Sequence, residues 1–190
     1  MEQPVIEINN LTARYNRCPV LKEINLQVNQ GEAVGIAGPN GAGKTTLFKV
    51  MLGLIPVEQG RVSLLGRELK TGPDRAWVRR KVGYVPQQTL PGNLPVSVHD
   101  AVLMGGWGKE YGFFHKLRPA DHESVGATLK RMGLADREWQ DCRSLSGGEQ
   151  QKVSIARALI RKAEILLLDE PTTYLDCDFQ TEILELLKEI

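Results

Sequence analysis

The feature that most constrains this chain is a glycine-rich segment, Gly38–Thr46, which fits the pattern G-x-x-x-x-G-K-[ST] without a mismatch. The apolar run Ala33–Ala37 precedes it and predicts a short buried strand. Thr46–Leu52 follows it and predicts a helix that stops at Gly53. Strand, glycine loop and helix in this order form the context of a phosphate-binding loop. A glycine-rich turn with a chance Lys-Thr pair does not account for that context.

The residue types in this loop explain how it would hold a nucleotide. Glycines let successive backbone N–H groups converge on an anion, and a helix that begins near Gly43 adds the positive end of its dipole. We expect Lys44 to reach the β- and γ-phosphates and the Thr45 hydroxyl to ligate Mg²⁺. The candidate nucleotide-binding residues of the loop are Gly38, Pro39, Asn40, Gly41, Ala42, Gly43, Lys44, Thr45 and Thr46.

Composition narrows the functional classes. The 190 residues are long enough for one well-buried domain, and 24 Lys and Arg against 23 acids leave no basic excess of the kind that nucleic-acid binding needs. The three cysteines are scattered without a C-x-x-C pair, which indicates a reducing compartment. The three histidines show no metal-ligand spacing with them. Neither a secretory signal nor an apolar run of membrane-spanning length is visible, so we expect membrane association only through a partner.

Apolar patterning along the chain predicts an α/β protein. Alternating residues predict half-buried strands at Val5–Ile8 and Ile24–Val28, and glycine or proline bounds two further strand segments, Gly60–Gly66 and Val82–Gln87. Ser97 opens a helix with an acid three residues on. Strands near both ends of the chain with helical segments between them indicate a single α/β domain.

The middle of the chain is expected to be a helical insertion. The stretch from Gln88 to Asp141 carries little strand signal. Within it, Gly105–Gly108 is expected to break the helix that begins at Ser97. Helical patterning returns from Asp121 to Met132.

Two acids follow a strongly apolar run near the end of the chain. Ile165–Leu168 predicts a fully buried strand, and Asp169 and Glu170 come directly after it. Asp169 can hold the Mg²⁺ shell, and Glu170 can polarise an attacking water. A strand end that emerges into solvent would also explain the acids, but their combination with Lys44 and Thr45 favours the functional interpretation.

A second capped helix begins at Leu145–Gln150. Ser146 and Glu149 have the spacing of a capping box, and two glycines lie between them. Such a helix N-terminus offers a second anion site, although an ordinary well-capped helix has the same residues. The residues alone leave both interpretations open.

Taken in order, these motifs resemble those of an ABC transporter ATPase subunit. The matching segments are Gly38–Thr46, Tyr84–Gln87, Leu145–Gln150, Leu168–Thr172 and Leu175-Asp176, and the resemblance covers essentially the whole chain. It implies the α/β fold of a P-loop NTPase, with a mostly parallel core sheet, an antiparallel N-terminal β subdomain and a helical insertion. The implied organisation is one ABC ATPase domain over residues 1–190, with a helical subdomain at about residues 88–160.

The resemblance also implies roles for the matching residues. Tyr15 is similar to the aromatic residue that stacks on adenine, Glu170 to the general base, and Asp176 to the aspartate that couples two sites across a dimer. Gln87 is similar to the glutamine that meets Mg²⁺ and the attacking water, so the implied Mg²⁺ residues are Thr45, Gln87 and Asp169. A second subunit, head to tail in a homodimer, would contact ATP through Leu145, Ser146, Gly147, Gly148, Glu149 and Gln150.

Two departures from the family pattern stand out. Tyr174 occupies a position where many relatives carry a small residue, and no histidine follows His122, although the family's switch histidine lies on a strand beyond Glu170. In the family this strand lies between the phosphate-loop strand and the Asp169 strand. We therefore expect the 190 residues to be part of a longer chain and, alone, to bind ATP poorly and hydrolyse little.

The segment Pro95–Gly105 resembles the corresponding part of zinc and manganese importer ATPases, and Tyr111–Phe114 and Arg131–Ala135 agree with that group. The resemblance implies an energising subunit at the cytoplasmic face of the inner or plasma membrane. Its cofactors would be ATP and Mg²⁺. Its partners would be permease subunits that dock at Gln87–Val98 and, indirectly, a solute-binding protein, with no nucleic acid.

Other classes of ATPase remain as alternatives. Iron-chelate and cobalamin importer ATPases share much of the same pattern. A soluble ABC ATPase acting on DNA or the ribosome would need a long coiled-coil insertion or a second such domain, and the sequence has neither. An unrelated P-loop kinase or GTPase would not explain Leu145–Gln150 followed by Asp169-Glu170.

Overall fold

The computed structural model describes residues 4–15, 18–87, 95–106, 117–171 and 181. The chain divides into two compact units, Met1–Val82 and Gly83–Ile190, and each has its own arrangement of elements. Within the described residues, no helix has the length and apolar character needed to cross a membrane.

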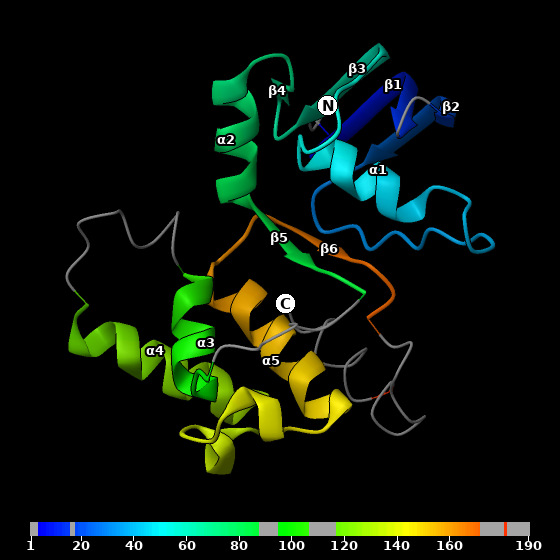
Figure 1. Cartoon of the computed structure of the whole chain (residues 1–190). Helices are drawn as coiled ribbons and strands as arrows, with labels where there is room; N and C mark the ends of the chain where they lie inside the picture. The colour runs from blue at the N-terminus through cyan, green and yellow to red at the C-terminus, as the bar shows by residue number, and fades with distance from the viewer. Residues whose placement is uncertain (1–3, 16–17, 88–94, 107–116, 172–180, 182–190) are drawn as a thin grey trace. The chain divides into compact units, whose positions relative to one another are not determined.

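The first unit is built on a four-stranded antiparallel sheet in the order β2-β1-β3-β4 (Figure 1). The strands are β1 Ile6–Tyr15, β2 Cys18–Val28, β3 Gln59–Leu64 and β4 Arg67–Glu68. The first two are longer than their alternating patterns predicted. This arrangement confirms the antiparallel N-terminal sheet that the family resemblance implied.

A bulge interrupts the pairing of β1 and β2 near Asn10. The register shifts between Ile8 and Leu11, and Asn10 adopts a positive φ of 48°. The Asn25 side chain satisfies the displaced backbone, because its Oδ1 accepts from the Asn10 amide at 2.9 Å and its Nδ2 donates to the Glu23 carbonyl at 3.0 Å. The irregular segment therefore keeps its hydrogen bonds.

Helix α1 (Lys44–Met51) follows the glycine loop and buries Leu47, Val50 and Met51. The predicted helix is confirmed, but the predicted buried strand Ala33–Ala37 is wrong. That segment has no regular structure and is exposed, with Val34 48% and Ile36 36% accessible. Among the described residues no strand pairs with it, and an extended segment without a ladder partner leaves its backbone groups to the solvent.

Helix α2 (Gly72–Lys81) closes the first unit. Thr71 caps it, since the Thr71 hydroxyl accepts from the Asp74 amide and the Asp74 carboxylate accepts from the Thr71 amide at 2.8 Å. The Thr71 hydroxyl also donates to the Asp74 carboxylate at 2.6 Å; this bond, the bond from the Thr71 amide and the Arg67 guanidinium 2.8 Å away hold the pKa of Asp74 well below its usual range. A proline at the start and a basic last turn match the preferences of helix ends.

The described residues of the second unit form two neighbouring strands and three α-helices. Strands β5 (Val82–Val85) and β6 (Ile165–Leu168) pair and run in the same direction (Figure 1). The expectation that the β6 residues are all buried is wrong in detail, because Ile165 and Leu167 are buried whereas Leu166 and Leu168 are partly exposed.

The helices of the second unit form its core. They are α3 Val98–Gly105, α4 Pro119–Arg131 and α5 Gly147–Ile160, with short 3₁₀ turns η1 Ala135–Arg137 and η2 Cys142–Ser144. Ser97 caps α3 as predicted, and the helix ends at Gly105. Val98, Val102, Val125, Leu129, Val153 and Ile155 are all buried within one cluster. The boundary of a helical subdomain at about residues 88–160 stays a prediction.

Candidate nucleotide-binding site

The glycine loop of the first unit has a backbone that specific glycines make possible. Gly41 and Gly43 have φ values of 83° and 93°, in the left-handed region that other residues avoid. A Cβ at Gly43 would lie 2.9 Å from Leu21 Cδ2 and 3.2 Å from Val20 Cγ1 on β2. Both the dihedral angle and the close approach to β2 therefore favour glycine at the start of α1.

Lys44 bends back over the loop that precedes it. Its Nζ donates to the Gly38 carbonyl at 2.9 Å and to the Pro39 carbonyl at 3.3 Å, and the Ala42 amide donates to the Pro39 carbonyl at 3.1 Å. These bonds close a compact loop with a cation on it.

The N-terminus of α1 carries the positive end of the helix dipole. No side chain caps α1, and its first turn contains no acid, so no carboxylate of the helix itself competes for this end. Thr45 and Thr46, in the same turn, are partly buried. The structure thus shows a compact glycine loop followed by a helix, and the anion-binding role of its residues stays a prediction.

The predicted adenine-stacking residue, Tyr15, ends β1 opposite Cys18. The placement of its side chain lies outside what the structure describes. Its role stays a prediction.

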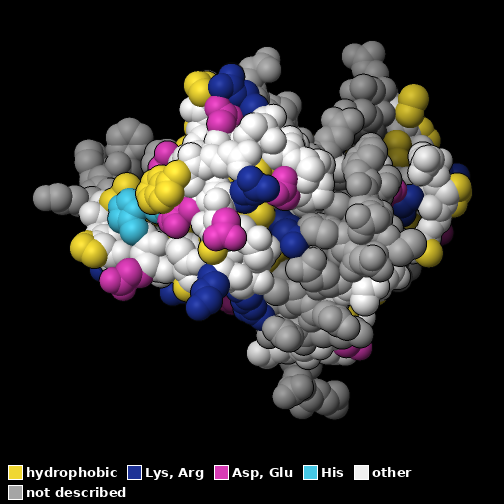
Figure 2. Space-filling view, turned by 90° about the horizontal axis from the view of Figure 1, so that it is seen from below, with side chains coloured by type: hydrophobic (Ala, Val, Ile, Leu, Met, Phe, Trp, Pro, Cys, Tyr) yellow, Lys and Arg dark blue, Asp and Glu magenta, His cyan; other side chains and the backbone are white. Residues whose placement is uncertain are grey.

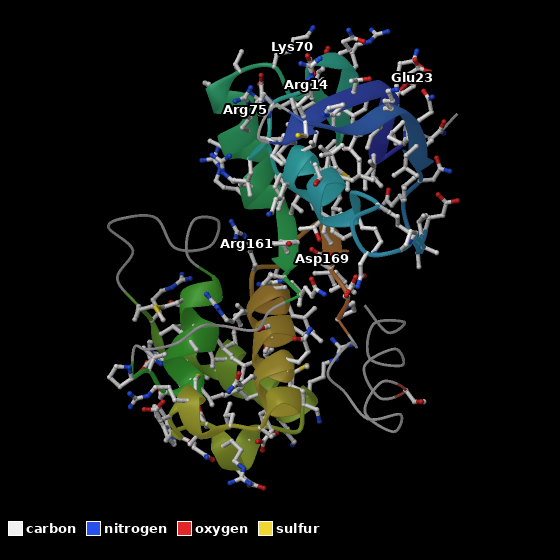
Figure 3. The ribbon with its side chains drawn as sticks, turned by 45° about the vertical axis from the view of Figure 1, so that its right-hand side comes forward. Arg14, Glu23, Lys70, Arg75, Arg161 and Asp169 are labelled. Carbon is white, nitrogen blue, oxygen red and sulfur yellow. The ribbon has the colours of Figure 1, made fainter. Side chains whose placement is uncertain are left out.

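Asp169 lies directly after β6 in the second unit (Figure 3). Its amide donates to the Val85 carbonyl at 2.9 Å, which extends the β5–β6 pairing by one residue. Its side chain is buried, with 2% exposed, and its Oδ2 accepts a hydrogen bond from the Tyr84 hydroxyl at 3.1 Å. Burial, together with the negative charge of Asp169, raises the pKa of Tyr84 to about 12, so this hydroxyl is a donor at neutral pH.

Glu170 is held by a different side chain of the segment after β5. The Gln87 Nε2 donates to the Glu170 Oε2 at 2.6 Å, and Glu170 has a positive φ of 49°. A non-glycine residue at positive φ is uncommon and is found at constrained sites. Two consecutive acids after β6 thus contact two different residues, Tyr84 and Gln87.

The segment before α5 forms the predicted capping box. The Ser146 Oγ accepts from the Glu149 amide at 3.3 Å, while Glu149 Oε2 accepts from the Ser146 amide and hydroxyl, each at 2.9 Å. These bonds from Ser146 hold the pKa of Glu149 below its usual value. Gln150 Nε2 donates to the Leu145 carbonyl at 3.1 Å, and a Cβ at Gly147 would meet nothing within 4 Å.

Several predicted residues lie outside the described part of the chain. Asp176 and Tyr174 belong to this group, as does most of the permease-docking segment, residues 88–94. Within the described residues, no three His, Cys, Asp or Glu side chains form a group able to hold a metal ion. The Mg²⁺ roles of Thr45, Gln87 and Asp169 stay predictions.

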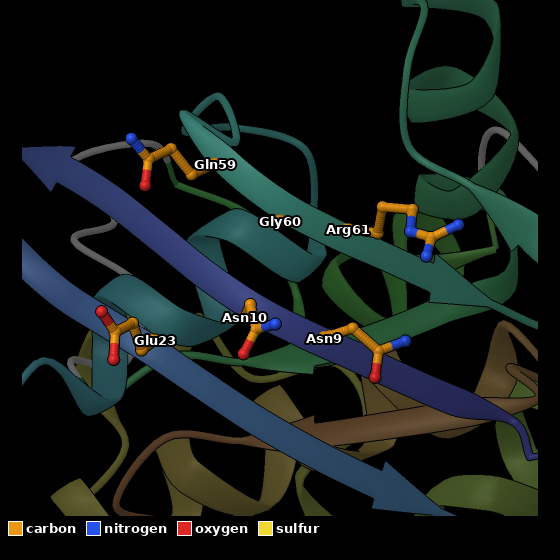
Figure 4. A pocket seen from close by; sticks show the side chains of 6 residues that line it. All are labelled: Asn9, Asn10, Glu23, Gln59, Gly60 and Arg61. Atoms are coloured by element: carbon orange, nitrogen blue, oxygen red, sulfur yellow. The ribbon is translucent and has the colours of Figure 1, made fainter.

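A polar pocket opens on the sheet of the first unit, and none of the predicted nucleotide-binding residues lines it. Figure 4 shows the lining residues on three adjacent strands, β1, β2 and β3. They are Asn9, Asn10, Glu23, Gln59, Gly60 and Arg61.

The two described histidines stack in the second unit. The His99 ring lies between His122, with centroids 5.0 Å apart, and Trp139, at 4.6 Å. His99 Nε2 and His122 Nδ1 are 3.1 Å apart, so one nitrogen donates to the other. His99 is buried and Trp139 is 72% exposed, and Figure 2 shows a histidine beside hydrophobic side chains at the surface. Both histidines therefore make ring contacts within the second unit.

The sequence patterns did not identify Tyr84, which contacts one of the two acids after β6. Tyr84 belongs to the matching segment Tyr84–Gln87 but received no role. Its position on β5 could have indicated a role. Strands β5 and β6 are neighbours, and the Tyr84 hydroxyl on β5 donates to Asp169, which follows β6.

Comparison with known proteins identifies the family to which the chain belongs. Residues 21–173 match the family described as ABC transporter. The chain is 40% identical over 186 residues to the manganese transport system ATP-binding protein MntB of Bacillus subtilis (strain 168), covering 97% of this chain and 72% of that protein. It is 38% identical over 188 residues to the zinc uptake system ATP-binding protein ZurA of Listeria monocytogenes serovar 1/2a, covering 98% and 71%.

Two solved structures show the same fold. One is cbiO1 from Clostridium perfringens, part of the ABC transporter complex cbiONQ, with a TM-score of 0.83, 29% identity and coverage of 99% of this chain and 74% of that chain. The other is a dimeric ATP-binding cassette in a post-hydrolysis state, bound to ADP and Pi, with a TM-score of 0.83, 29% identity and coverage of 97% and 82%. The chain belongs to the ABC transporter family and is an ATP-binding, ATP-hydrolysing domain of it.

Proposed function

We propose that this chain energises an ABC importer whose cargo is a metal ion, zinc or manganese, by binding and hydrolysing ATP. The observation that carries the proposal is the 40% and 38% identity, over nearly the whole chain, to manganese and zinc transport ATP-binding proteins. The metal ion is cargo that passes through other subunits. The lack of a three-residue metal cluster among the described residues therefore does not bear on this proposal.

ATP is held by the loop Gly38–Thr46, with Tyr15 against the adenine. The left-handed glycines, the uncapped N-terminus of α1 and the position of Lys44 on the loop support this assignment. Lys44 exchanges its contacts with the Gly38 and Pro39 carbonyls for phosphate oxygens. A cation on a helix N-terminus without its own acid suits a polyanion.

The residues present suit Mg²⁺ as a cofactor. Mg²⁺ prefers oxygen ligands, keeps several waters and is commonly held by one or two carboxylates plus phosphates. A buried Asp169 carboxylate supplies such a ligand, with the Thr45 hydroxyl and Gln87 as the other candidate donors. When bound, Mg²⁺ neutralises charge that develops on the phosphates.

Glu170 acts as the general base that orients and deprotonates the attacking water. Its hydrogen bond from Gln87, at 2.6 Å, supports this assignment, because it holds the carboxylate in a fixed position directly after β6. The same hydrogen bond connects Gln87 to Glu170, the proposed base. The family resemblance assigns Gln87 to Mg²⁺ and the attacking water.

The complete site is shared by two copies of the chain. In a head-to-tail homodimer, residues Leu145–Gln150 and Asp176 of one copy close over the ATP held by the loop of the other. The exposed Ser146 and Gly147 at the start of α5 support this, as does the dimeric state of the similar ADP-bound cassette. ATP binding closes the dimer, and phosphate release reopens it.

The dimer binds and drives permease subunits at the cytoplasmic face of the inner or plasma membrane. The segment Gln87–Val98 is the proposed docking groove, and a solute-binding protein delivers the cargo to the permease. Residues 1–190 form the ABC ATPase domain, with the helical subdomain at about residues 88–160. The location of α3, α4 and α5 within that range supports this organisation.

Transport by the protein together with its permease tests this function. We expect ATP-dependent uptake of radioactive zinc or manganese into cells that lack their own importer. Lys44→Ala should abolish this uptake while leaving protein levels unchanged. Uptake of an iron chelate or cobalamin but of neither metal ion would contradict the cargo assignment.

The base assignment has its own test. Glu170→Gln should lower ATP hydrolysis by about 10²–10⁴-fold and trap an ATP-bound dimer, detected by gel filtration, because the amide cannot accept the proton. Glu164→Gln is the matched control, since Glu164 lies just before β6 and Glu170 just after it. A Glu170→Gln protein that hydrolyses ATP at the parent rate would refute the assignment.

A further inference from the structure

We propose that Tyr84 is a positioning residue that orients the Asp169 carboxylate toward the Mg²⁺ of the bound nucleotide. The proposal rests on the proposed function, in which Asp169 is a ligand of that ion. It concerns Tyr84 alone. Neither the sequence motifs nor the family match gives the Tyr84 hydroxyl a role.

Asp169 is fixed at two points by neighbouring residues of β5. Its amide donates to the Val85 carbonyl at 2.9 Å, and its Oδ2 accepts from the Tyr84 hydroxyl at 3.1 Å. The first bond holds the backbone at the strand end, and the second restricts the orientation of the carboxylate. An ionised carboxylate has about four lone-pair sites, so one donor leaves most of them for a metal and its waters.

A neutral donor orients this carboxylate without cancelling its charge. Asp169 is 2% exposed, and among the described residues no lysine or arginine forms an ion pair with it. A basic partner would neutralise the carboxylate and compete with a cation for it, whereas a phenol hydroxyl does neither. The negative charge therefore remains available to a divalent ion.

Tyr84 and Gln87 each contact a different one of the two acids after β6. Tyr84 contacts the proposed metal ligand Asp169, and Gln87 contacts the proposed base Glu170. Loss of the Tyr84 hydroxyl should therefore weaken metal binding, whereas the contact on the base remains. If the Tyr84 ring served only to fill space beside β6, phenylalanine would serve equally well.

The test compares metal and nucleotide binding by the protein and its Tyr84→Phe variant. Mn²⁺ replaces Mg²⁺ as the probe, because its binding in the presence of ATP is read directly by electron paramagnetic resonance. We expect Tyr84→Phe to raise the Kd for Mn²⁺ about 10-fold, the lower end of what loss of a group behind a metal ligand costs. ATP affinity measured in EDTA should stay unchanged, since the phosphate loop is intact.

Ser124→Ala is the matched control. It also removes one hydroxyl donor from the second unit, but the Ser124 hydroxyl donates to the Ala120 carbonyl within α4, at 2.8 Å, and not to a carboxylate. It should leave the Mn²⁺ affinity unchanged. Asp169→Asn serves as the reference for complete loss of metal binding.

Two results would overturn the proposal. An unchanged Mn²⁺ Kd in Tyr84→Phe would show that the hydroxyl does not position Asp169. An equal loss of ATP affinity with and without metal would show that Tyr84 is only structural. If the parent protein itself binds no Mn²⁺ with ATP, or if Asp169→Asn leaves Mn²⁺ binding intact, the proposed metal site fails and the role of Tyr84 fails with it.

Discussion

The two glycine-containing helix starts of this chain, before α1 and before α5, solve the same problem in opposite ways. A helix N-terminus has four backbone N–H groups without an intrahelical acceptor. At α1, Gly43 offers no side-chain cap and the first turn contains no acid, while Lys44 adds a positive charge. At α5, Ser146 and Glu149 cap each other's backbone, and a carboxylate already lies at the helix end.

Under the proposed function, this difference explains why the α1 start would bind a nucleotide alone and the α5 start would not. At α1 the positive end of the dipole and a lysine point to an external anion for compensation. At α5 the Glu149 carboxylate already supplies part of that compensation, so a phosphate would meet both attraction and repulsion. The α5 start is therefore suited to join a nucleotide that another loop has already bound.

The largest expected effect comes from removing the cation of the α1 start. Lys44→Ala should lower ATP hydrolysis by about 10²–10³-fold, the typical loss when one preorganised electrostatic group is removed from a transition state. Steady-state ATPase assays measure it. Lys49→Ala, in the last turn of the same helix, is the control and should retain the parent rate. Equal losses in both variants would remove the distinction between the two ends of α1.

The backbone of the two starts can be compared by the same substitution in each. Gly43→Ala should destabilise the protein by about 1–2 kcal/mol, because φ is 93° there and an L side chain avoids that region. Gly147→Ala should be neutral or stabilising by up to about 1 kcal/mol, since its Cβ would enter open space at a helical position. Urea unfolding of both variants tests the contrast, and a comparable loss in both would refute it.

Removing the side-chain cap affects only the α5 start. Ser146→Ala should lower the free energy of unfolding by about 1 kcal/mol, the usual cost of an N-cap hydroxyl. Ser146→Thr keeps a hydroxyl and should recover most of that loss. Thermal and urea unfolding are the measurements, and identical stabilities for the alanine and threonine variants would show that the cap contributes nothing.

The smallest effect concerns pH. Because bonds from Ser146 lower the pKa of Glu149 in the folded protein, its contribution to stability is full above the unfolded pKa, about 4.3. The contribution is lost as pH falls through the folded value.

Glu149→Gln should remove this dependence. In the parent protein, the contribution of Glu149 to the free energy of unfolding should fall by about 0.3–0.5 kcal/mol from pH 7 to pH 4. The effect is small because the Glu149 side chain is partly exposed. Urea unfolding at both pH values measures it, with Glu123→Gln on α4 as the control. An unchanged pH dependence in Glu149→Gln would mean that the capping carboxylate contributes none of it.

Local patterns in the sequence were enough to locate both helix starts. The segment from Gly38 onward predicted a glycine loop followed by a helix, and the spacing of Ser146 and Glu149 predicted the capping box; the structure confirms helix α1 and the capping box. Capping and loop closure involve residues three to six positions apart. The chemistry of such short segments is largely independent of the rest of the fold.

Strand burial was predicted less well because it depends on distant partners. Ala33–Ala37 is as apolar as a buried strand, yet it is exposed where no described strand pairs with it. Ile165–Leu168 is uniformly apolar, yet its side chains alternate between buried and partly exposed. Apolar residues permit burial, but a strand also needs neighbours that satisfy its backbone and cover its faces.

By itself the sequence determined the helix that follows the glycine loop, the capped helix α5, the two acids after β6 and the family. Only the tertiary structure decided how each acid is held, with Tyr84 on Asp169 and Gln87 on Glu170. These partners are 85 and 83 residues apart along the chain, and the pairing of β5 with β6 brings them together. A contact of that separation leaves no local pattern, because its geometry comes from the strand pairing rather than from the spacing of residues.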